Sequence, residues 1–114
     1  MSLEINFYIC NGKVYYAMKS KTEILQILSL YKPIAQKTYG LTKLGVFGSV
    51  ARGEQGTDSD VDVCYEGEAP SLLTLDLIQS DLERLLDCKV DMVRVRKDMN
   101  VLLKQRIQKE AVYV

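Results

Sequence analysis

The sequence predicts a single small α/β (α+β) domain: a small mixed β-sheet flanked by helices. The chain has 114 residues, which suits one domain. Short β-prone runs alternate with segments of helical spacing in the order ββ-α-β-(turn or helix)-β-α-β-α, which is typical of this class. Apolar residues make up 47% and charged residues 26%, so the chain can bury a core and does not have the composition of a disordered protein.

Residues 4–18 predict a β-hairpin. Apolar and polar side chains alternate on both sides of Asn11-Gly12. Asn-Gly between two β-prone stretches is a strong hairpin signal, because both central turn positions need a positive φ. We therefore expect residues 1–20 to form an N-terminal hairpin extension and residues 21–114 to form the main domain.

A helix is expected over residues 22–38, where apolar residues recur at helical spacing. Thr22 is the expected N-cap. Pro33 should kink or divide this helix, because proline removes a backbone donor. Gly40 supplies the stop.

The remaining pattern predicts a sheet with two further helices. Ser71 follows a proline and precedes an amphipathic stretch, so it is the expected N-cap of that helix. We expect strands at 44–47, 61–65 and 90–95, helices at 71–87 and after Asp98, and a terminal strand at 111–114.

Composition excludes several classes of function. The chain has no His, which removes Ser-His-Asp and Cys-His catalysis together with His-ligated zinc or iron. Its three Cys are odd in number and widely spaced, which indicates neither a disulfide framework nor a zinc cage and fits a cytoplasmic location. No apolar run approaches the ~18 residues that span a membrane. A net charge of zero argues against extended nucleic-acid binding.

Charge is unevenly distributed along the chain. Residues 54–88 hold ten acids and one base, either a solvated surface or a segment that collects cations. The C-terminal segment is basic, which has two interpretations. It contacts a partner or the nucleotide, or it is a solvated helix face. Its basic residues are Arg94, Arg96, Lys97, Lys104, Arg106 and Lys109.

Two carboxylates open the strand expected at 61–65. Asp60 and Asp62 are two positions apart, so on a strand they share one face. Adjacent like charges are unfavourable unless something neutralises them. Mg²⁺ prefers one or two carboxylates completed by water and phosphate oxygens. These two residues therefore predict a magnesium site.

A third acid, Asp91, lies within the apolar run 90–93, where we expect it to be a buried carboxylate in need of a partner. If its strand neighbours that of Asp62, the three acids meet at one metal cluster. Gly48 and Ser49 follow an apolar strand and suit the binding of nucleotide phosphates, although no Lys follows as in a Walker A loop.

Together, these motifs resemble the minimal nucleotidyltransferases (MNT) of the polymerase-beta-like superfamily. Their fingerprint is a strand, then G-S-x-A-R-G, then S-D-x-D, with a third acid on a later strand. Here it reads Gly48-Ser49-Val50-Ala51-Arg52-Gly53, then Ser59-Asp60-Val61-Asp62, then Asp91. The likeness runs from about residue 22 to the C-terminus and implies the polymerase-beta-like nucleotidyltransferase fold, with the hairpin as an addition.

The resemblance also implies an enzyme and roles for its residues. A Mg²⁺-dependent nucleotidyltransferase, with two ions and ATP as substrate, would use the acids as metal ligands, and the third acid would help to activate the acceptor hydroxyl. The catalytic and metal-binding residues would be Asp60, Asp62 and Asp91. The phosphate-binding residues would be Gly48 and Ser49, supported by Arg52 and Ser59.

MNT proteins are typically paired with HEPN toxins as antitoxins. The resemblance implies that this chain transfers AMP from ATP to a hydroxyl of a HEPN-type toxin, with a tyrosine as the expected acceptor. Two alternatives stay open: a catalytically silent antitoxin that blocks its partner by contact, and a nucleotidyltransferase for a small hydroxyl-bearing molecule. A homodimer is also compatible with the sequence.

Overall fold

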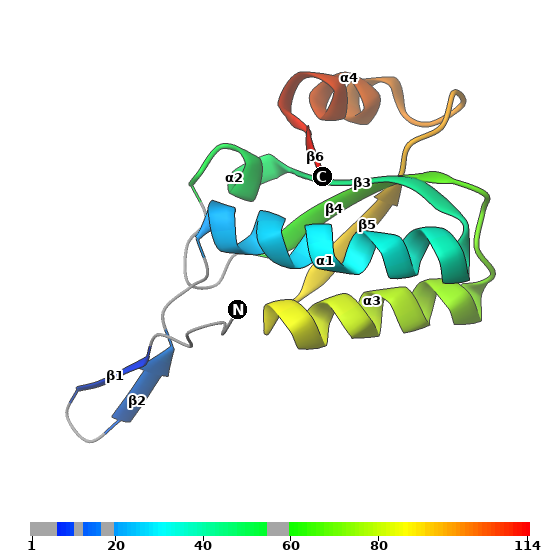
Figure 1. Ribbon diagram of the computed structural model, residues 1–114. Coiled ribbons are helices and arrows are strands. Elements are labelled where there is room, and N and C mark those ends of the chain that lie inside the picture. Colours follow the sequence, from blue (N-terminus) through cyan, green and yellow to red (C-terminus); the bar gives the residue numbers. More distant parts are fainter. Residues whose placement is uncertain (1–6, 11–12, 17–19, 55–59) are drawn as a thin grey trace.

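The computed structural model describes residues 7–10, 13–16, 20–54 and 60–114 (Figure 1). Strands β1 (Phe7–Cys10) and β2 (Lys13–Tyr16) pair antiparallel in a two-stranded sheet of their own. This confirms the hairpin. Asn11 and Gly12, to which the sequence assigns the turn, lie outside the described residues.

A separate four-stranded sheet has the order β5-β4-β3-β6. Strand β3 pairs antiparallel with both of its neighbours, whereas β4 and β5 run parallel. The expected small mixed sheet is therefore confirmed. Its strands are β3 (Leu41–Phe47), β4 (Val61–Gly67), β5 (Val90–Arg94) and β6 (Val112–Tyr113).

Helix α1 (Lys21–Tyr39) begins one residue earlier than the sequence predicts. The N-cap is Ser20, not Thr22, because Ser20 forms a capping box with Glu23: each side chain accepts a hydrogen bond from the other residue's backbone N–H. Gly40 ends the helix in the left-handed conformation, as predicted. No helix among the described residues is both long enough and apolar enough to cross a membrane.

Pro33 was expected to kink or divide α1, and the division is wrong, since the helix runs through this residue. Proline removes the hydrogen bond to the carbonyl four residues earlier, which here belongs to Ser29. Both residues lie on the exposed side of α1, where water can satisfy that carbonyl. The helix therefore tolerates the proline.

Helices α1 and α3 (Leu72–Leu86) lie side by side on one face of the sheet (Figure 1). The predicted N-cap of α3 is confirmed, because the Ser71 side chain accepts a hydrogen bond from the Thr74 N–H. The Tyr31 hydroxyl donates to Asp81 at 3.0 Å and joins the two helices. The main core fills the space between this helical layer and the sheet. Its fully buried side chains include Ile24, Leu28, Leu44, Val46, Val63, Ile78 and Leu82.

Helix α4 (Val101–Glu110) covers the opposite face, next to the short helix α2 (Gly48–Ala51) (Figure 1). A second apolar cluster holds it there: Phe47, Cys64, Met99 and Ile107. Because successive strand residues alternate between faces, Asp62 points to the same side of β4 as Cys64. The candidate site therefore lies on the face that α4 covers.

Candidate active site

Two candidate carboxylates stand beside each other on adjacent strands. In the parallel pairing of β4 with β5, Asp62 is directly opposite Asp91. The two strands are therefore neighbours, which is the condition under which these acids were predicted to meet. Side chains at opposite positions of a strand pair lie close together on the same face. The sheet thus brings together two acids that are 29 positions apart in the sequence.

The Asp62 side chain is half-buried and carries a charge that its surroundings disfavour. Burial raises the pKa of Asp62 first, and the negative charge of Asp91 raises it further. Asp60, which is exposed just before β4, adds a smaller effect in the same direction. Arg106 opposes the shift without cancelling it. The site thus has an excess of negative charge around Asp62.

The expectation that Asp91 is a buried carboxylate is wrong, because its side chain is exposed. Strand β5 lies at the edge of the sheet, and only alternate residues such as Val90 point into the main core. An apolar run on an edge strand thus does not require both faces to be buried. Asp91 has access to solvent and to any molecule that approaches this face.

In the part of the chain that the structure describes, no three His, Cys, Asp or Glu side chains form a ready-made metal cage. The Asp62–Asp91 pair nevertheless fits a magnesium ion. Carboxylate oxygens are the ligands that Mg²⁺ prefers, and it commonly takes only one or two from the protein. A divalent cation at this pair would also relieve the repulsion that raises the pKa of Asp62.

Gly48 stands where the polypeptide leaves β3, and the site requires a glycine there. Its φ is +70°, a conformation that side chains disfavour. A Cβ at this position would also collide with Oδ2 of Asp62. The absence of a side chain therefore lets the first turn of α2 approach the carboxylate. The sequence motif and the acidic pair are in contact through this residue.

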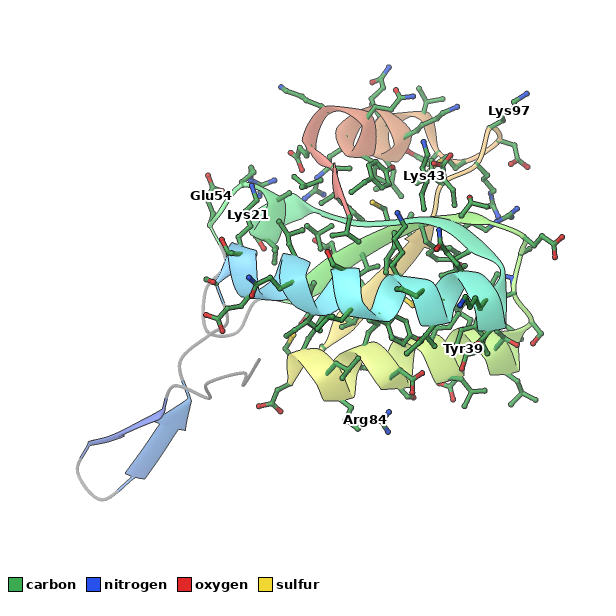
Figure 2. The ribbon with its side chains drawn as sticks, viewed as in Figure 1. Lys21, Tyr39, Lys43, Glu54, Arg84 and Lys97 are labelled. Atoms are coloured by element: carbon green, nitrogen blue, oxygen red, sulfur yellow. The ribbon has the colours of Figure 1, made fainter. Side chains whose placement is uncertain are left out.

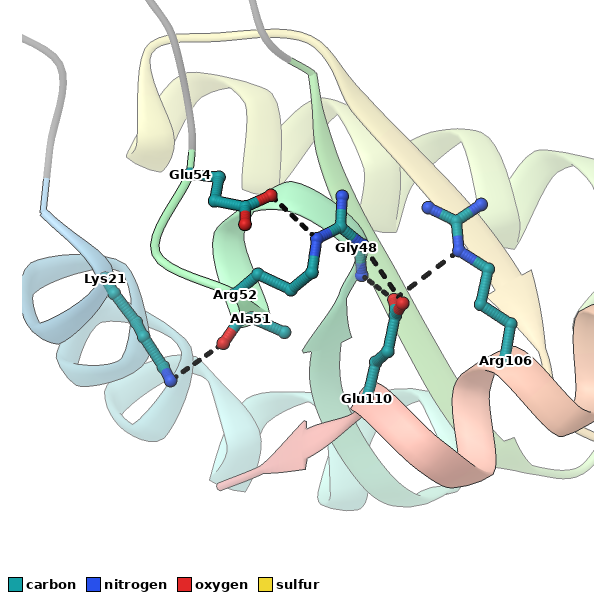
Figure 3. A network of polar contacts seen from close by, with 7 residues as sticks. All are labelled: Lys21, Gly48, Ala51, Arg52, Glu54, Arg106 and Glu110. Atoms are coloured by element: carbon teal, nitrogen blue, oxygen red, sulfur yellow. Dashed lines mark hydrogen bonds and ion pairs between the residues drawn. The ribbon is translucent and has the colours of Figure 1, made fainter.

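On the other side of Gly48, one carboxylate of α4 accepts hydrogen bonds from three residues (Figure 3). Glu110 accepts hydrogen bonds from the Gly48 N–H at 3.2 Å, from Nη1 of Arg52 at 3.0 Å and from Nε of Arg106 at 3.4 Å. Burial alone would raise the pKa of Glu110, but the two guanidinium groups and the Gly48 N–H together hold it below its ordinary value. We call Arg52, Arg106 and Glu110 the arginine cluster.

Arg52 joins the loop after α2 to α4 through its contact with Glu110. Besides Glu110, it binds Glu54 through Nε at 2.9 Å. At the end of α2, the Ala51 carbonyl accepts a hydrogen bond from Lys21 at 2.8 Å, and Lys21 and Glu54 lie at the same end of the molecule (Figures 2 and 3). The loop is thus tied to both α1 and α4.

Ser49 and Ser59 are the two serines that the resemblance assigns to the phosphate site. Ser49 is half-buried within α2, next to Gly48. Ser59 lies outside the described residues. The Gly48 N–H, which the sequence analysis assigns to phosphate, is bound by the Glu110 carboxylate here.

Sequence reasoning did not single out Glu110, and it placed Arg106 only within the basic C-terminal stretch. One signal was present: the two residues are four apart, which is the spacing of a helical ion pair. That spacing is common on solvated helices, so it could not show that α4 folds over Gly48.

A comparison with protein families now identifies the family to which this fold belongs. The sequence profile described as "Nucleotidyltransferase domain" matches residues 28–114. The chain belongs to this family. It is accordingly a nucleotidyltransferase, and the resemblance to minimal nucleotidyltransferases is confirmed. A curated relative, the protein adenylyltransferase MntA of Thermococcus cleftensis, is 37% identical over 99 residues, which cover 86% of this chain and 99% of the relative.

Solved structures share the fold of this nucleotidyltransferase. A toxin–antitoxin structure with AMP-PNP aligns with a TM-score of 0.64 at 22% identity, over 78% of this chain and 72% of that one. A complex of a tri-AMPylated HEPN toxin from Shewanella oneidensis with its MNT antitoxin aligns with a TM-score of 0.57 at 19% identity, over 78% and 68%. At such identities the likeness concerns the fold alone.

Proposed function

We propose that this nucleotidyltransferase transfers AMP from ATP to a tyrosine hydroxyl of a HEPN-type toxin and acts as its antitoxin. The observation that carries the chemistry is the Asp62–Asp91 pair, with Gly48 in contact with Asp62. The partner is inferred from the MntA relative, named a protein adenylyltransferase, and from the complexes of MNT antitoxins with HEPN toxins.

In the proposed reaction, the acceptor oxygen forms a bond to the α-phosphorus of ATP. The bond from that phosphorus to the oxygen bridging it to the β-phosphate breaks, and pyrophosphate leaves. Asp91 is exposed and stands opposite Asp62, so it can receive the hydroxyl proton directly or orient the hydroxyl. Gly48 and Ser49 bind the β/γ-phosphates, supported by Arg52 and Ser59.

Mg²⁺ fits the Asp62–Asp91 pair, and in this proposal Asp60 would join these two residues as a ligand, with two ions expected. When bound, it would supply Lewis-acid stabilisation of the charge on the phosphate oxygens. The protein's own contribution is to hold the carboxylates on rigid strands. Asp62 is fixed in the sheet between Phe47 on β3 and Asp91 on β5, so its position does not depend on a loop.

The experiment uses ATP labelled at the α-phosphate, Mg²⁺, the purified chain and a lysate of its source organism. We expect a label on a protein of HEPN type, identified by mass spectrometry as one or more AMP groups on a tyrosine. ATP labelled at the γ-phosphate should give no label, because that phosphate leaves with pyrophosphate.

Two variants control this experiment. Asp62→Asn removes the half-buried carboxylate and should abolish labelling, whereas Asp76→Asn removes an exposed carboxylate on α3 and should leave it unchanged. Absence of any α-label with ATP binding intact would contradict the proposal and favour an antitoxin that acts by contact. A label on a small molecule alone would point to a different acceptor.

A further inference from the structure

We infer that Arg106 of α4 is a ligand of the nucleotide's polyphosphate and that Glu110 is the positioning residue that aims it. This inference rests on the proposed function and deepens it, because it assigns phosphate binding to a side chain outside the Gly48–Gly53 motif. The first observation is position. Nη2 of Arg106 lies 3.4 Å from the point where a Gly48 Cβ would stand, and Asp62 lies against that same point.

The Arg106 guanidinium is held from two sides and left open on the third. Its group lies over the Phe47 ring, 5.8 Å from the centroid, and its Nε donates to Glu110. Among the described residues, neither Nη atom has a hydrogen-bond or ion-pair partner. In Figure 3 these two nitrogens point away from Glu110. The side chain is 49% exposed, so a ligand can reach them.

This geometry differs from that of a purely structural ion pair. Arginine binds a carboxylate most strongly with two parallel N–H donors, in a fork. Here the contact with Glu110 uses only Nε and is long, at 3.4 Å. Glu110 thus fixes the stem of the guanidinium while the donors best suited to a phosphate stay available.

A second observation shows that this part of the chain binds anionic oxygens. The Glu110 carboxylate accepts hydrogen bonds from the Gly48 N–H and from two guanidinium groups. These belong to Arg52, which follows α2, and to Arg106 on α4. In Figure 3 the free ends of both guanidinium groups point the same way, away from Glu110. The two side chains therefore form a pair of cationic donors on either side of Gly48.

The neighbouring acids explain why the ligand should be a polyphosphate. Asp60, Asp62 and Asp91 make this end of the sheet negative, and the triphosphate of a nucleotide is negative as well. Cationic donors from the protein are needed beside it to offset the repulsion. Arg106 is suited to this because its charge already acts on Asp62.

The test measures binding directly, by equilibrium dialysis of labelled ATP with Mg²⁺ and the full chain. Arg106→Gln should weaken ATP binding by roughly ten- to a hundredfold, the range for a lost hydrogen bond to a charged group. The dissociation constant of inorganic tripolyphosphate, measured by its competition with ATP, should rise by a similar factor in this variant. Lys37→Gln is the control, because it removes one charge from an exposed position on α1 and should stay within about twofold of the wild type.

Equal ATP affinities for the two variants would overturn the inference. A weaker affinity for ATP with an unchanged affinity for tripolyphosphate would also overturn it, because Arg106 would then contact the base or the ribose. If Arg106→Gln does not fold, Arg106→Lys decides: it keeps the charge, loses the planar fork and should bind several-fold more weakly, whereas wild-type affinity would refute the assignment. Failure of the wild type to label a toxin would refute the proposed function and leave this result intact.

Discussion

The acidic pair and the arginine cluster lie on either side of Gly48, and they handle charge in opposite ways. In the cluster, Glu110 is surrounded by cationic and N–H donors, which hold its pKa below its ordinary value. In the pair, burial and the charge of Asp91 raise the pKa of Asp62. One half of the site balances its charges within the chain, and the other does not.

This difference indicates which half stabilises the folded chain without a ligand and which half needs a cation to offset its charge. A charge cluster that is internally matched stabilises the folded chain in the absence of any other molecule. Like charges held together on a rigid sheet are unfavourable until a cation arrives. We therefore expect substitutions in the acidic pair to affect activity without loss of stability, and substitutions around Gly48 to affect both.

The largest effect is expected from Asp62→Asn. It should reduce AMP transfer by about a thousandfold or more, because loss of a metal ligand removes several kcal/mol of transition-state stabilisation. At neutral pH the free energy of unfolding should rise, because burial and Asp91 disfavour the charged form of Asp62 in the folded state. Transfer of α-label and urea unfolding measure the two quantities.

The pH dependence of this stability difference checks its cause. The folded-state pKa of Asp62 is raised above its ordinary value of 3.8, so the wild type recovers stability as the pH falls through the raised pKa. The advantage of Asp62→Asn should therefore shrink in acid. A variant that is less stable than the wild type at neutral pH would mean that Asp62 is matched by a partner, as Glu110 is.

The next effect concerns the glycine that joins the two halves. Gly48→Ala and Gly53→Ala impose nearly the same backbone strain, since the φ angles are +70° and +71°. The left-handed conformation should lower the free energy of unfolding of each variant by about 1–2 kcal/mol. Only Gly48→Ala places a Cβ against Oδ2 of Asp62. Its free energy of unfolding should therefore fall by about 1 kcal/mol more than that of Gly53→Ala, and it should lose most of its activity.

Gly53→Ala is the control for strain, because no atom of the described residues beyond its two chain neighbours lies within 4 Å of its new Cβ. Chemical denaturation of the two variants gives the stability difference, and ATP binding gives the functional one. Equal losses of stability and activity would show that Gly48 is required only for its φ and that close contact with Asp62 does not matter.

The sequence predicted the fold well because its signals are local. The Gly40 stop and the Ser71 cap depend on neighbouring residues, and both are confirmed. The exposure of Asp91 was mispredicted because an apolar run does not reveal that its strand lies at a sheet edge. Burial of one strand face depends on which strand pairs beside it, and that is decided by residues far along the chain.

The candidate site was predictable in part for a related reason. Asp62 and Asp91 were predicted to meet on the condition that their strands are neighbours, and the pairing of β4 with β5 fulfils it. Glu110 was not predicted. Its contact with Gly48 spans 62 positions and depends on α4 packing through Ile107 onto the second apolar cluster, which no short motif encodes.

A smaller effect is expected from Glu110→Gln, which keeps the shape of the side chain and removes its charge. Arg106 and Arg52 would lose the anion that positions them, so the KM for ATP should rise about three- to tenfold with a smaller change in kcat. A role limited to stability would instead leave the KM of the folded variant unchanged. Steady-state kinetics at saturating acceptor separates these outcomes.

The stability of Glu110→Gln should depend on pH with the opposite sign to that of Asp62→Asn. The folded-state pKa of Glu110 lies below its ordinary value of 4.5, so its stabilisation is present above that value and is lost as the pH falls through the folded-state pKa. The variant should be less stable than the wild type at pH 6, and the gap should close in acid. Urea unfolding at several pH values measures it, and a gap that is independent of pH would exclude the charge as its cause.

The smallest effect is expected from Glu54→Gln, which removes the other carboxylate on the same guanidinium. Glu54 binds Nε of Arg52 at 2.9 Å, closer than Glu110 binds Nη1, but its side chain is 64% exposed against 20% for Glu110. An exposed ion pair contributes little, because water screens it and two long side chains must be ordered. Glu54→Gln should therefore stay within about 0.5 kcal/mol of the wild type and within about twofold in ATP affinity. If Glu54→Gln instead raised the KM for ATP as much as Glu110→Gln, the position of Arg52 would depend on its shortest contact. The contact between α4 and Gly48 would then not distinguish the arginine cluster from an ordinary surface ion pair.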